Sequence, residues 1–229
     1  MCPRASEWDP VWVWHHHMGP TNIWLAELLA NEMRLRPGMR VLDMGCGTAA
    51  TSLFLALEYD LEVWAADLWI DPTDNLARIR ETGLDRRVYP LRVDAAATFP
   101  FADGWFDALF SVDAYHYFGM SDDFLASYAA LVRPGGQVGI IVPGDSADSM
   151  RWDSFRSANW WRALWERSGV VDIDLADDIV GGRALWLRFL EANAAWTGIG
   201  ELEDQPDGEL LFSEPGKALG FTRVVATRR

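Results

Sequence analysis

Three aspartates, each placed where an apolar run ends, are the residues whose type and spacing point most directly to chemistry. Asp43 lies in VLDMGCG and is followed by Gly45 and Gly47, Asp67 comes twenty residues after the second glycine, and Asp94 ends a later apolar run. Glycines let backbone approach a ligand closely. A carboxylate at the next strand end can accept both hydroxyls of a ribose. The pattern therefore predicts a site for an adenosine-type ligand.

Asp43 separates two classes of nucleotide ligand. Gly45, Gly47 and Ala50 satisfy a relaxed dinucleotide fingerprint. However, an ionised carboxylate two residues before the first glycine would be desolvated beside phosphates that are also negative. We therefore expect a cationic ligand, and a nucleotide-dependent oxidoreductase stays open as the alternative.

Alternating strands and helices must position these acids. Apolar strands that alternate with helices indicate a parallel α/β sheet covered on both faces. Pro90 cannot donate to a strand ladder, so its strand is expected at the sheet edge. Strands are expected in MRVLDM, LEVWAA, RVYPLRV, FDALFSV, QVGIIV and LGFTRVVATR. Helices are expected after Thr21 or Asn22, up to about Glu58, and near residues 74–82, 121–132, 152–167 and 182–196.

Several motifs in this order carry a family resemblance. VLDMGCG, the acid in AADLW, Asp94 in RVDAAA, FPFADGWFDALFSVDAYHYF and LVRPGGQVGIIV together resemble the class I S-adenosylmethionine-dependent methyltransferases over roughly residues 20–145. The resemblance implies one domain, residues 1–229, with a Rossmann-like, seven-stranded, mostly parallel sheet and helices on both faces. It also implies methyl transfer from S-adenosylmethionine to a small-molecule metabolite. A catalytically silent S-adenosylmethionine-binding regulatory protein is a further alternative.

The resemblance also assigns roles to individual positions. Asp43 would lie near the methionyl part of the cofactor, Asp67 would bind the ribose, and Asp94 would accept the adenine amino group. Ala49 stands where the family usually has a third glycine. The full set of implied cofactor-binding residues is Asp43, Gly45, Gly47, Asp67, Leu68, Asp94, Ala95 and Ser111.

His116 and Tyr115, in SVDAYHYF, are the expected catalytic residues. In this superfamily, residues after the fourth strand face the transferred methyl group. His116 could take a proton from a hydroxyl, amine or thiol, since the pKa of histidine is near neutral. It could equally be a structural histidine, and Tyr115 or Tyr117 could orient the substrate instead.

Composition restricts the partners. The net charge of -14 and the pI near 4.6 repel a phosphate backbone, so no nucleic-acid partner is expected. No apolar run reaches membrane-spanning length and no signal segment is visible, so we expect a cytoplasmic protein without a membrane partner. The histidines at 15–17 are consecutive and rarely point at one ion, so no metal is expected. The sequence does not predict the oligomeric state.

Two aromatic segments flank the core pattern. Residues 1–20 are expected to form an N-terminal arm, in which Trp12 and Trp14 share one side if the chain is extended. The arm would be either a lid that closes over cofactor or a segment packed permanently on the body. Residues 143–200 would form a helical cover of the substrate pocket. We expect the tryptophans of the two segments to meet over the cofactor.

Overall fold

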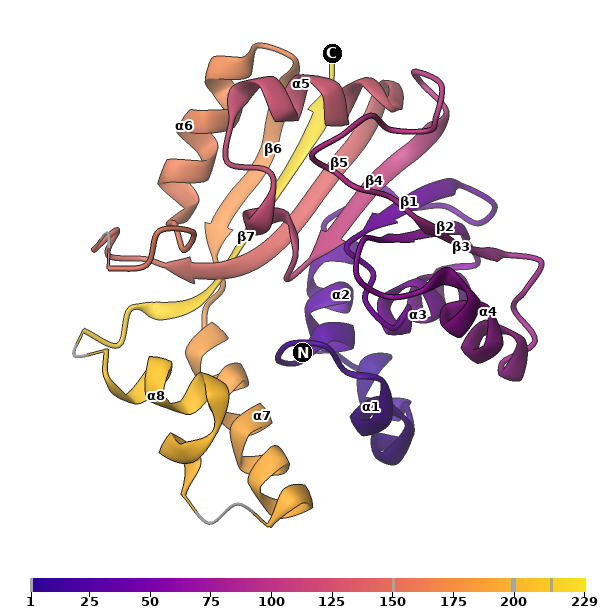
Figure 1. Ribbon diagram of the computed structural model, residues 1–229. Coiled ribbons are helices and arrows are strands. Elements are labelled where there is room, and N and C mark those ends of the chain that lie inside the picture. The colour runs from indigo at the N-terminus through magenta and orange to yellow at the C-terminus, as the bar shows by residue number, and fades with distance from the viewer. Residues whose placement is uncertain (1, 150, 199–200, 215) are drawn as a thin grey trace.

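The computed structural model describes residues 2–149, 151–198, 201–214 and 216–229, and within them one seven-stranded sheet forms the centre (Figure 1). The strand order is β3-β2-β1-β4-β5-β7-β6, and β7 alone runs antiparallel to its neighbours. The expected seven-stranded, mostly parallel sheet is therefore confirmed. The strands are β1 Arg40–Met44, β2 Glu62–Asp67, β3 Val88–Arg92, β4 Phe106–Val112, β5 Val132–Asp145, β6 Val171–Asp178 and β7 Leu219–Arg228.

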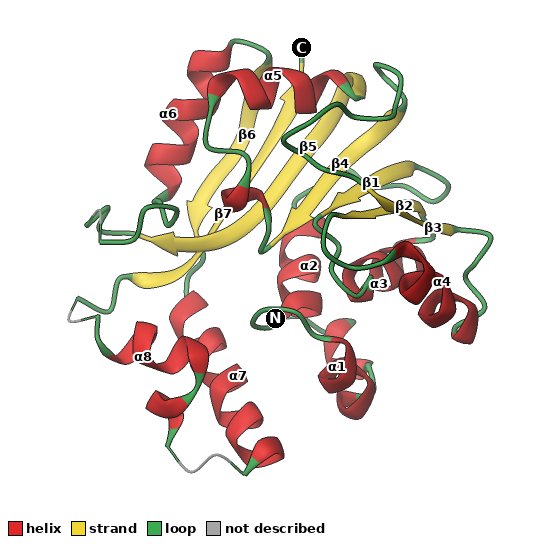
Figure 2. Ribbon diagram, viewed as in Figure 1, coloured by secondary structure: helices red, strands yellow, loops and turns green. Residues whose placement is uncertain are grey.

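Helices cover both faces of the sheet (Figure 2). One apolar core lies between the sheet and α2, α3 and α4, and a second core lies between the sheet and α5 and α6. Helices α7 and α8 form an insertion between β6 and β7 that projects from the sheet (Figure 1). The helices are α1 Pro10–His16, α2 Asn22–Ala30, α3 Ala50–Tyr59, α4 Pro72–Glu81, α5 Asp122–Ala130, α6 Ala158–Ser168, α7 Gly182–Thr197 and α8 Pro206–Phe212.

Strand composition explains the sheet order. The central strands β1 and β4 are almost fully buried, as expected for strands covered by helices on both sides. Pro90 lies in β3, which forms one edge of the sheet as predicted. The parallel strands end at the same side of the sheet, so residues that follow β1, β2 and β4 are brought together there.

The N-terminal segment is helical, so the extended conformation considered above is wrong. Asp9 caps α1 by accepting a hydrogen bond from the Val11 amide, and Pro10 begins the helix at a favourable position. Trp12 and His16 then lie one turn apart, with stacked rings whose centroids are 4.2 Å apart. Trp12 and Trp14 consequently point in different directions around the helix.

The tryptophans of the two segments do not form one group: Trp14 meets Trp196 of α7, with ring centroids 5.5 Å apart, but the others lie in separate places. Trp161 and Trp165 are fully buried in the core beneath α5 and α6. Trp8 and Trp12 instead pack against the opposite core, where Trp8 contacts Phe54. The sheet separates Trp161 and Trp165 from the arm, whereas Trp152 packs against the same core as Trp8 and Trp12. Residues 150, 199 and 200 of the expected cover lie outside the described residues.

Candidate functional site

A cavity of about 310 Å³ lies at the carboxyl ends of β1, β2 and β4. Its wall combines the glycine loop after β1, the residues after β2 and β3, the turn after β4 and part of the N-terminal arm. In doubly wound sheets, ligands bind outside the carboxyl ends of strands. The cavity therefore lies where the sequence predicted a ligand.

The glycine loop forms one wall because its backbone packs more closely than side chains would allow. Gly45 has φ +77°, and an added Cβ would lie 2.2 Å from the Cβ of Ala114. Gly47 has φ +54°, and its carbonyl accepts a 2.9 Å hydrogen bond from the Asn75 amide group. A nearby left-handed residue, Ala49 with φ +65°, precedes α3 where the family usually has glycine. The loop thus exposes main chain to the cavity.

Asp67 ties the loop to the end of β2. Its Oδ2 accepts a 2.9 Å hydrogen bond from the Gly47 amide, and its Oδ1 accepts bonds from the Trp69 and Ile70 amides at 2.8 and 3.0 Å. These contacts fix the orientation of the carboxylate beside the cavity. A carboxylate has about four acceptor positions. The three amides occupy both positions of Oδ1 and one of Oδ2, so Oδ2 can still accept from a ligand hydroxyl.

The far end of the cavity offers flat apolar walls and one further acid. Leu68 and Trp69 follow Asp67, and both are largely exposed apolar side chains in the cavity wall. Asp94 and Ala95 lie after β3, where Asp94 Oδ1 accepts a 2.9 Å hydrogen bond from the Ala96 amide. Leu68, Asp94 and Ala95 are therefore placed together as expected.

Asp43 is fully buried behind the loop and does not line the cavity. Its Oδ2 accepts hydrogen bonds of 2.6 Å from the hydroxyls of both Thr51 and Ser52 in α3, whereas its Oδ1 has no partner. Burial raises the pKa of this carboxyl to about 6, although the two hydroxyls oppose the rise and the charge of Asp67 adds to it. Asp43 thus contributes charge and anchors α3, rather than touching a ligand from the wall.

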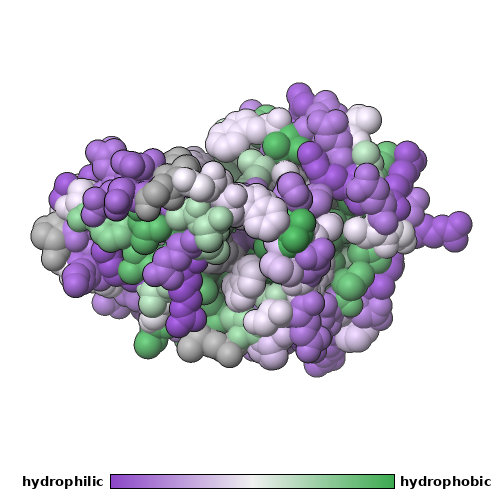
Figure 3. All heavy atoms as spheres, turned by 90° about the horizontal axis from the view of Figure 1, so that it is seen from below, coloured by the Kyte–Doolittle hydropathy of each residue, from purple (hydrophilic) through white to green (hydrophobic). Residues whose placement is uncertain are grey.

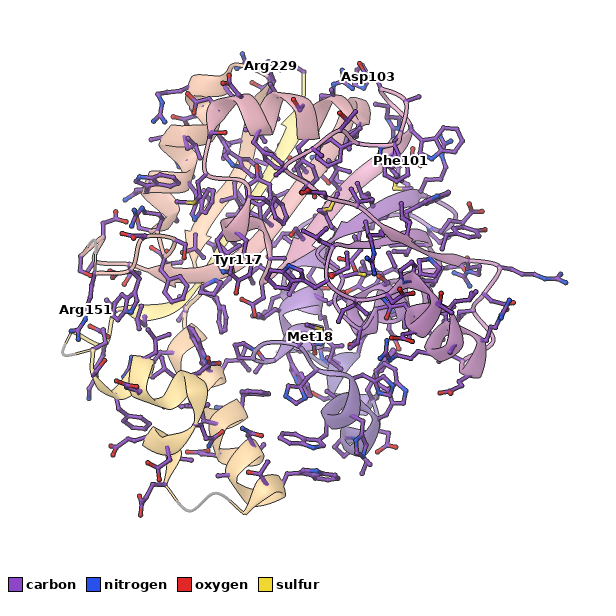
Figure 4. The ribbon with its side chains drawn as sticks, in the orientation of Figure 1. Met18, Phe101, Asp103, Tyr117, Arg151 and Arg229 are labelled. Carbon is purple, nitrogen blue, oxygen red and sulfur yellow. The ribbon has the colours of Figure 1, made fainter. Side chains whose placement is uncertain are left out.

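The opposite end of the cavity is formed by Asp113 and Tyr117 after β4, together with Met18 and Gly19 of the arm. Figure 4 labels Met18 and Tyr117, which approach the same region from different elements. Asp113 adopts φ +55°, and an added Cβ on Gly19 would lie 1.9 Å from its Oδ2. Burial, followed by the charge of Asp207, raises the pKa of the Asp113 carboxyl well above its usual range. The Asp113 amide donates a 2.8 Å hydrogen bond to the Ile141 carbonyl, but its carboxylate has no hydrogen bond or ion pair with the described residues.

Besides Asp43, three predicted site residues lie outside the cavity wall: Ser111, Tyr115 and His116. Ser111 is fully buried and donates a 2.8 Å hydrogen bond to the Met44 carbonyl, so it joins β4 to β1. Tyr115 is fully buried among Tyr128, Trp161 and Trp165. Its placement corrects the expectation that it faces the substrate, because the short 3-10 helix η2, Tyr115–Tyr117, turns its ring into the core.

His116 is buried against Tyr117 and Phe155, and its Nδ1 has no partner. Burial lowers the pKa of the imidazole to about 4, so the ring is neutral at physiological pH. His116 does not line the cavity, and its catalytic role stays a prediction. The arm that contributes Met18 and Gly19 was one of the two segments expected near the cofactor, whereas Trp69 and Phe118 were not singled out as wall residues from the sequence.

The histidines at 15–17 face separate aromatic partners. His15 packs edge-on to Trp196, His16 stacks on Trp12, and His17 contacts Phe189. Within the described ranges, no group of three histidine, cysteine, aspartate or glutamate residues is arranged to hold a metal ion. In the same part of the chain, no helix is long and apolar enough to cross a membrane.

The charge of the cavity wall favours a cationic ligand. Among the described residues that line it are Asp67, Asp94 and Asp113, and no lysine or arginine. A dinucleotide would place its diphosphate among these acids without a compensating cation, which is unfavourable. The orphaned Oδ1 of Asp43 behind the loop adds to the same negative field. The residues therefore fit an adenosine derivative that carries positive charge.

Comparisons with known sequences agree with this geometry. Residues 41–136 match the family described as "Methyltransferase domain". The 2-methyl-6-phytyl-1,4-hydroquinone methyltransferase of Synechocystis sp. is 32% identical over 127 residues, 56% of this chain and 37% of that protein. Phosphoethanolamine N-methyltransferase 1 of Arabidopsis thaliana is 29% identical over 107 residues, 47% of this chain and 21% of that protein. The chain thus spans less than half the length of these relatives.

Solved structures share the fold across most of the chain. Geranyl diphosphate C-methyltransferase from Streptomyces coelicolor A3(2) has a TM-score of 0.72 at 15% identity, covering 90% of this chain and 78% of that chain. The cyclase SpnF has a TM-score of 0.73 at 20% identity, covering 89% and 79% of the two chains. The same fold therefore occurs in a methyltransferase and in a cyclase, so the function of this chain must be argued from the residues of its site.

Proposed function

Because the chain belongs to the class I S-adenosylmethionine-dependent methyltransferase superfamily, we propose that it transfers a methyl group from S-adenosylmethionine to a small-molecule metabolite. The observation that carries the proposal is the cavity at the strand ends, which combines a close-packed glycine loop with acids and no basic side chain among its described residues. S-adenosylmethionine supplies an activated methyl group on a positively charged sulfur.

The residues that would hold the cofactor form a continuous series along the cavity. Asp67 would accept the ribose hydroxyls, since its carboxylate is oriented by three backbone amides. Leu68 and Trp69 offer apolar surface for the adenine, and Asp94 offers an acceptor for its amino group. Gly45 and Gly47 would give the methionyl part access to main chain, and the buried charge of Asp43 would favour its ammonium group.

The acceptor would enter at the Asp113 and Tyr117 end. Asp113 is the wall carboxylate with no partner among the described residues, and its raised pKa suits it to hold a proton from an acceptor nucleophile. Tyr117, Met18 and Gly19 narrow the same end and would exclude water from it. Much of the acceleration would come from holding the two reactants in line.

Supporting features of the whole chain point to a small acceptor in a reducing compartment. The net charge of -14 opposes nucleic acid as a substrate. Cys2 and Cys46 are both free and buried, which is consistent with the cytoplasm. We therefore place the activity in the cytoplasm.

The test is a methyl-transfer screen with S-adenosylmethionine that carries a deuterated methyl group. Mass spectrometry of a panel of hydroxyl-, amine- and thiol-containing metabolites should detect at least one labelled product. Asp67→Ala should weaken cofactor binding by roughly tenfold or more, because it removes a buried hydrogen-bonding partner. Asp71→Ala is the matched control: Asp71 caps α4 outside the cavity wall, so cofactor affinity should not change.

Two outcomes would contradict the proposal in distinguishable ways. Tight cofactor binding without any labelled product across the panel would favour a silent S-adenosylmethionine-binding protein. Failure to bind S-adenosylmethionine or its demethylated product would remove the methyltransferase assignment altogether.

A further inference from the structure

A second cavity, of about 480 Å³, lies between the N-terminal arm and α7. Its size falls in the range typical of small-molecule sites. Most of its wall is apolar or aromatic, with Trp14 and Trp24 on one side and Ile179, Leu185 and Phe189 on the other. Figure 3 views this side of the molecule and shows hydrophobic residues lying among hydrophilic ones.

The two cavities have no wall residue in common, although they lie on either side of one short segment. His17 and Thr21 line the second cavity, whereas Met18, Gly19 and Asn22 line the first. The second cavity is therefore a separate binding space, and the inference about it does not rest on the proposed methyl transfer.

Several polar side chains in this wall have hydrogen-bond partners, and one buried hydroxyl has none. The Cys2 thiol donates to the Trp24 carbonyl, the Ser6 hydroxyl donates to the Cys2 carbonyl, and His17 Nδ1 bonds the Trp14 carbonyl. The Oγ1 of Thr21, a residue only 7% exposed, has no hydrogen-bond partner. Buried hydroxyls are normally hydrogen-bonded, so this unpaired hydroxyl is unfavourable for the folded chain.

Thr21 is also strained. It adopts φ +55°, which is uncommon for a β-branched residue. Strain of this kind persists where surrounding structure enforces it, and it clusters at functional sites. The unsatisfied hydroxyl and the strained backbone thus coincide at the same wall of the second cavity.

Arg188 supplies the only charge among the described wall residues of this cavity. It is exposed on α7, and its guanidinium group has no ion pair or hydrogen bond with the described part of the chain. No aspartate or glutamate shares that wall, although the chain carries a net charge of -14. The second cavity is therefore opposite in charge to the first, whose wall holds three aspartates.

We propose that the second cavity binds an amphipathic small molecule with an apolar body and one anionic group. The apolar body lies between the arm and α7, and Arg188 holds the anionic group at the exposed rim. A guanidinium matches carboxylate, sulfonate and phosphate groups equally well in geometry. The shared requirement is one anionic head on an apolar body.

The probe is octanoate, and the comparison molecule is 1-octanol, which has a chain of the same length but an uncharged head group. Calorimetry should show that octanoate binds the full chain at least about threefold more tightly than 1-octanol, the size expected for an exposed ion pair. Arg188→Gln should remove this preference and Arg188→Lys should retain part of it. Arg80→Gln, which removes an exposed positive charge on α4, is the matched control and should leave octanoate binding unchanged.

A cavity-filling variant tests the location independently of charge. Ala184 lies exposed in α7 and lines the cavity, so Ala184→Phe should weaken binding of both octanoate and 1-octanol without unfolding the domain. Saturation with S-adenosylhomocysteine should leave octanoate binding intact, because the two cavities share no wall residue. The proposal is overturned if octanoate and 1-octanol bind equally, if Arg188→Gln changes nothing, or if S-adenosylhomocysteine displaces octanoate.

Discussion

Asp43 lies outside the cavity wall, but its charge can affect the binding of a cationic ligand in the cavity. Its carboxyl holds two hydroxyls of α3, while its remaining oxygen has no partner and lies close behind the glycine loop. Ionising this group is costly because it is fully buried. A bound cation nearby would offset part of that cost, which links the protonation of Asp43 to ligand binding.

The raised pKa of Asp43 predicts a pH-dependent contribution to stability. The pKa is about 6 when folded against 3.8 as the reference value, so the folded state binds this proton more tightly. The resulting stabilisation is full below the unfolded pKa and is lost as pH rises through the folded pKa. Asp43→Asn lacks this loss. The variant should therefore gain about 3 kcal/mol relative to the native chain between about pH 4 and about pH 7.

Urea unfolding of both proteins across this pH range measures the effect. Asp71→Asn is the control: the Thr73 amide lowers the pKa of Asp71 below 3.8, so the contribution of this group changes only at lower pH, and the difference between that variant and the native chain should stay constant across this range. A constant difference between the native chain and Asp43→Asn at every pH would contradict the burial argument.

Gly45 makes a second prediction at the residue scale. Gly45→Ala should destabilise the domain by more than about 1 kcal/mol, because it adds left-handed strain and a contact with Ala114. Gly38→Ala is a matched control, since Gly38 has nearly the same φ but nothing within 4 Å of the added Cβ. Thermal melts should show a smaller loss for Gly38→Ala, and Ala114→Gly should partly rescue Gly45→Ala. Equal losses at both glycines would mean that close packing at the loop is unimportant.

Sequence patterns were a good guide to the acids and a poor guide to what surrounds them. The positions of Asp67 and Asp94 at strand ends could be predicted because each follows an apolar run in the sequence. The orientations of Tyr115 and His116 could not be predicted in this way, because a single turn of η2 decides which ring enters the core and which faces the cavity. Tyr117 and Phe118, which follow them, are the aromatic residues of this segment that line the cavity.

At the scale of elements, the arm is held by contacts on which the fold depends. Ala5 is fully buried and its amide donates a 2.7 Å hydrogen bond to Glu27 Oε2. Trp8 Nε1 donates a 2.9 Å hydrogen bond to Glu58 Oε1. These contacts favour the permanently packed arm over the lid, and they confine any movement to the segment after α1.

Hydrogen exchange tests this division of the arm. Amides of α1 and of the residues just before it should exchange slowly without ligand, whereas residues 17–22 should gain protection when S-adenosylhomocysteine is added. Deleting residues 1–18 should lower stability as well as turnover, because buried Cys2, Ala5 and Val13 are lost. Rapid exchange throughout α1 that cofactor suppresses would instead establish a lid.

Strand β6 and helix α1 were not predicted from the sequence, and the start of strand β5 was misplaced, each for a physical reason. Strand β6 alternates acids with apolar residues and lies at a sheet edge, so it lacks the continuous apolar run of a central strand. Helix α1 has only seven residues, too few for a helical period to be visible among its tryptophans and histidines. Strand β5 begins before the Pro134-Gly135-Gly136 segment that was expected to precede it.

At the scale of the whole molecule, the sheet separates two apolar cores, and the two cavities differ in the charge of their walls. The core beneath α5 and α6 is filled by large aromatic side chains such as Tyr128, Trp161 and Trp165. The arm and the second cavity lie on the other face, whereas the first cavity lies at the carboxyl ends of the strands, where Met44, Val93 and Ala95 of the aromatic core line it. The acid-lined cavity and the arginine-rimmed cavity give the molecule two regions of opposite charge preference.

Calorimetric titration of the purified chain with S-adenosylhomocysteine and, separately, with NAD⁺ tests the central claim most directly. The account predicts saturable binding of S-adenosylhomocysteine, with affinity reduced by roughly tenfold or more in Asp67→Ala. It also predicts no measurable binding of NAD⁺, since the diphosphate would meet three wall aspartates. Saturable NAD⁺ binding without any response to S-adenosylhomocysteine would contradict it.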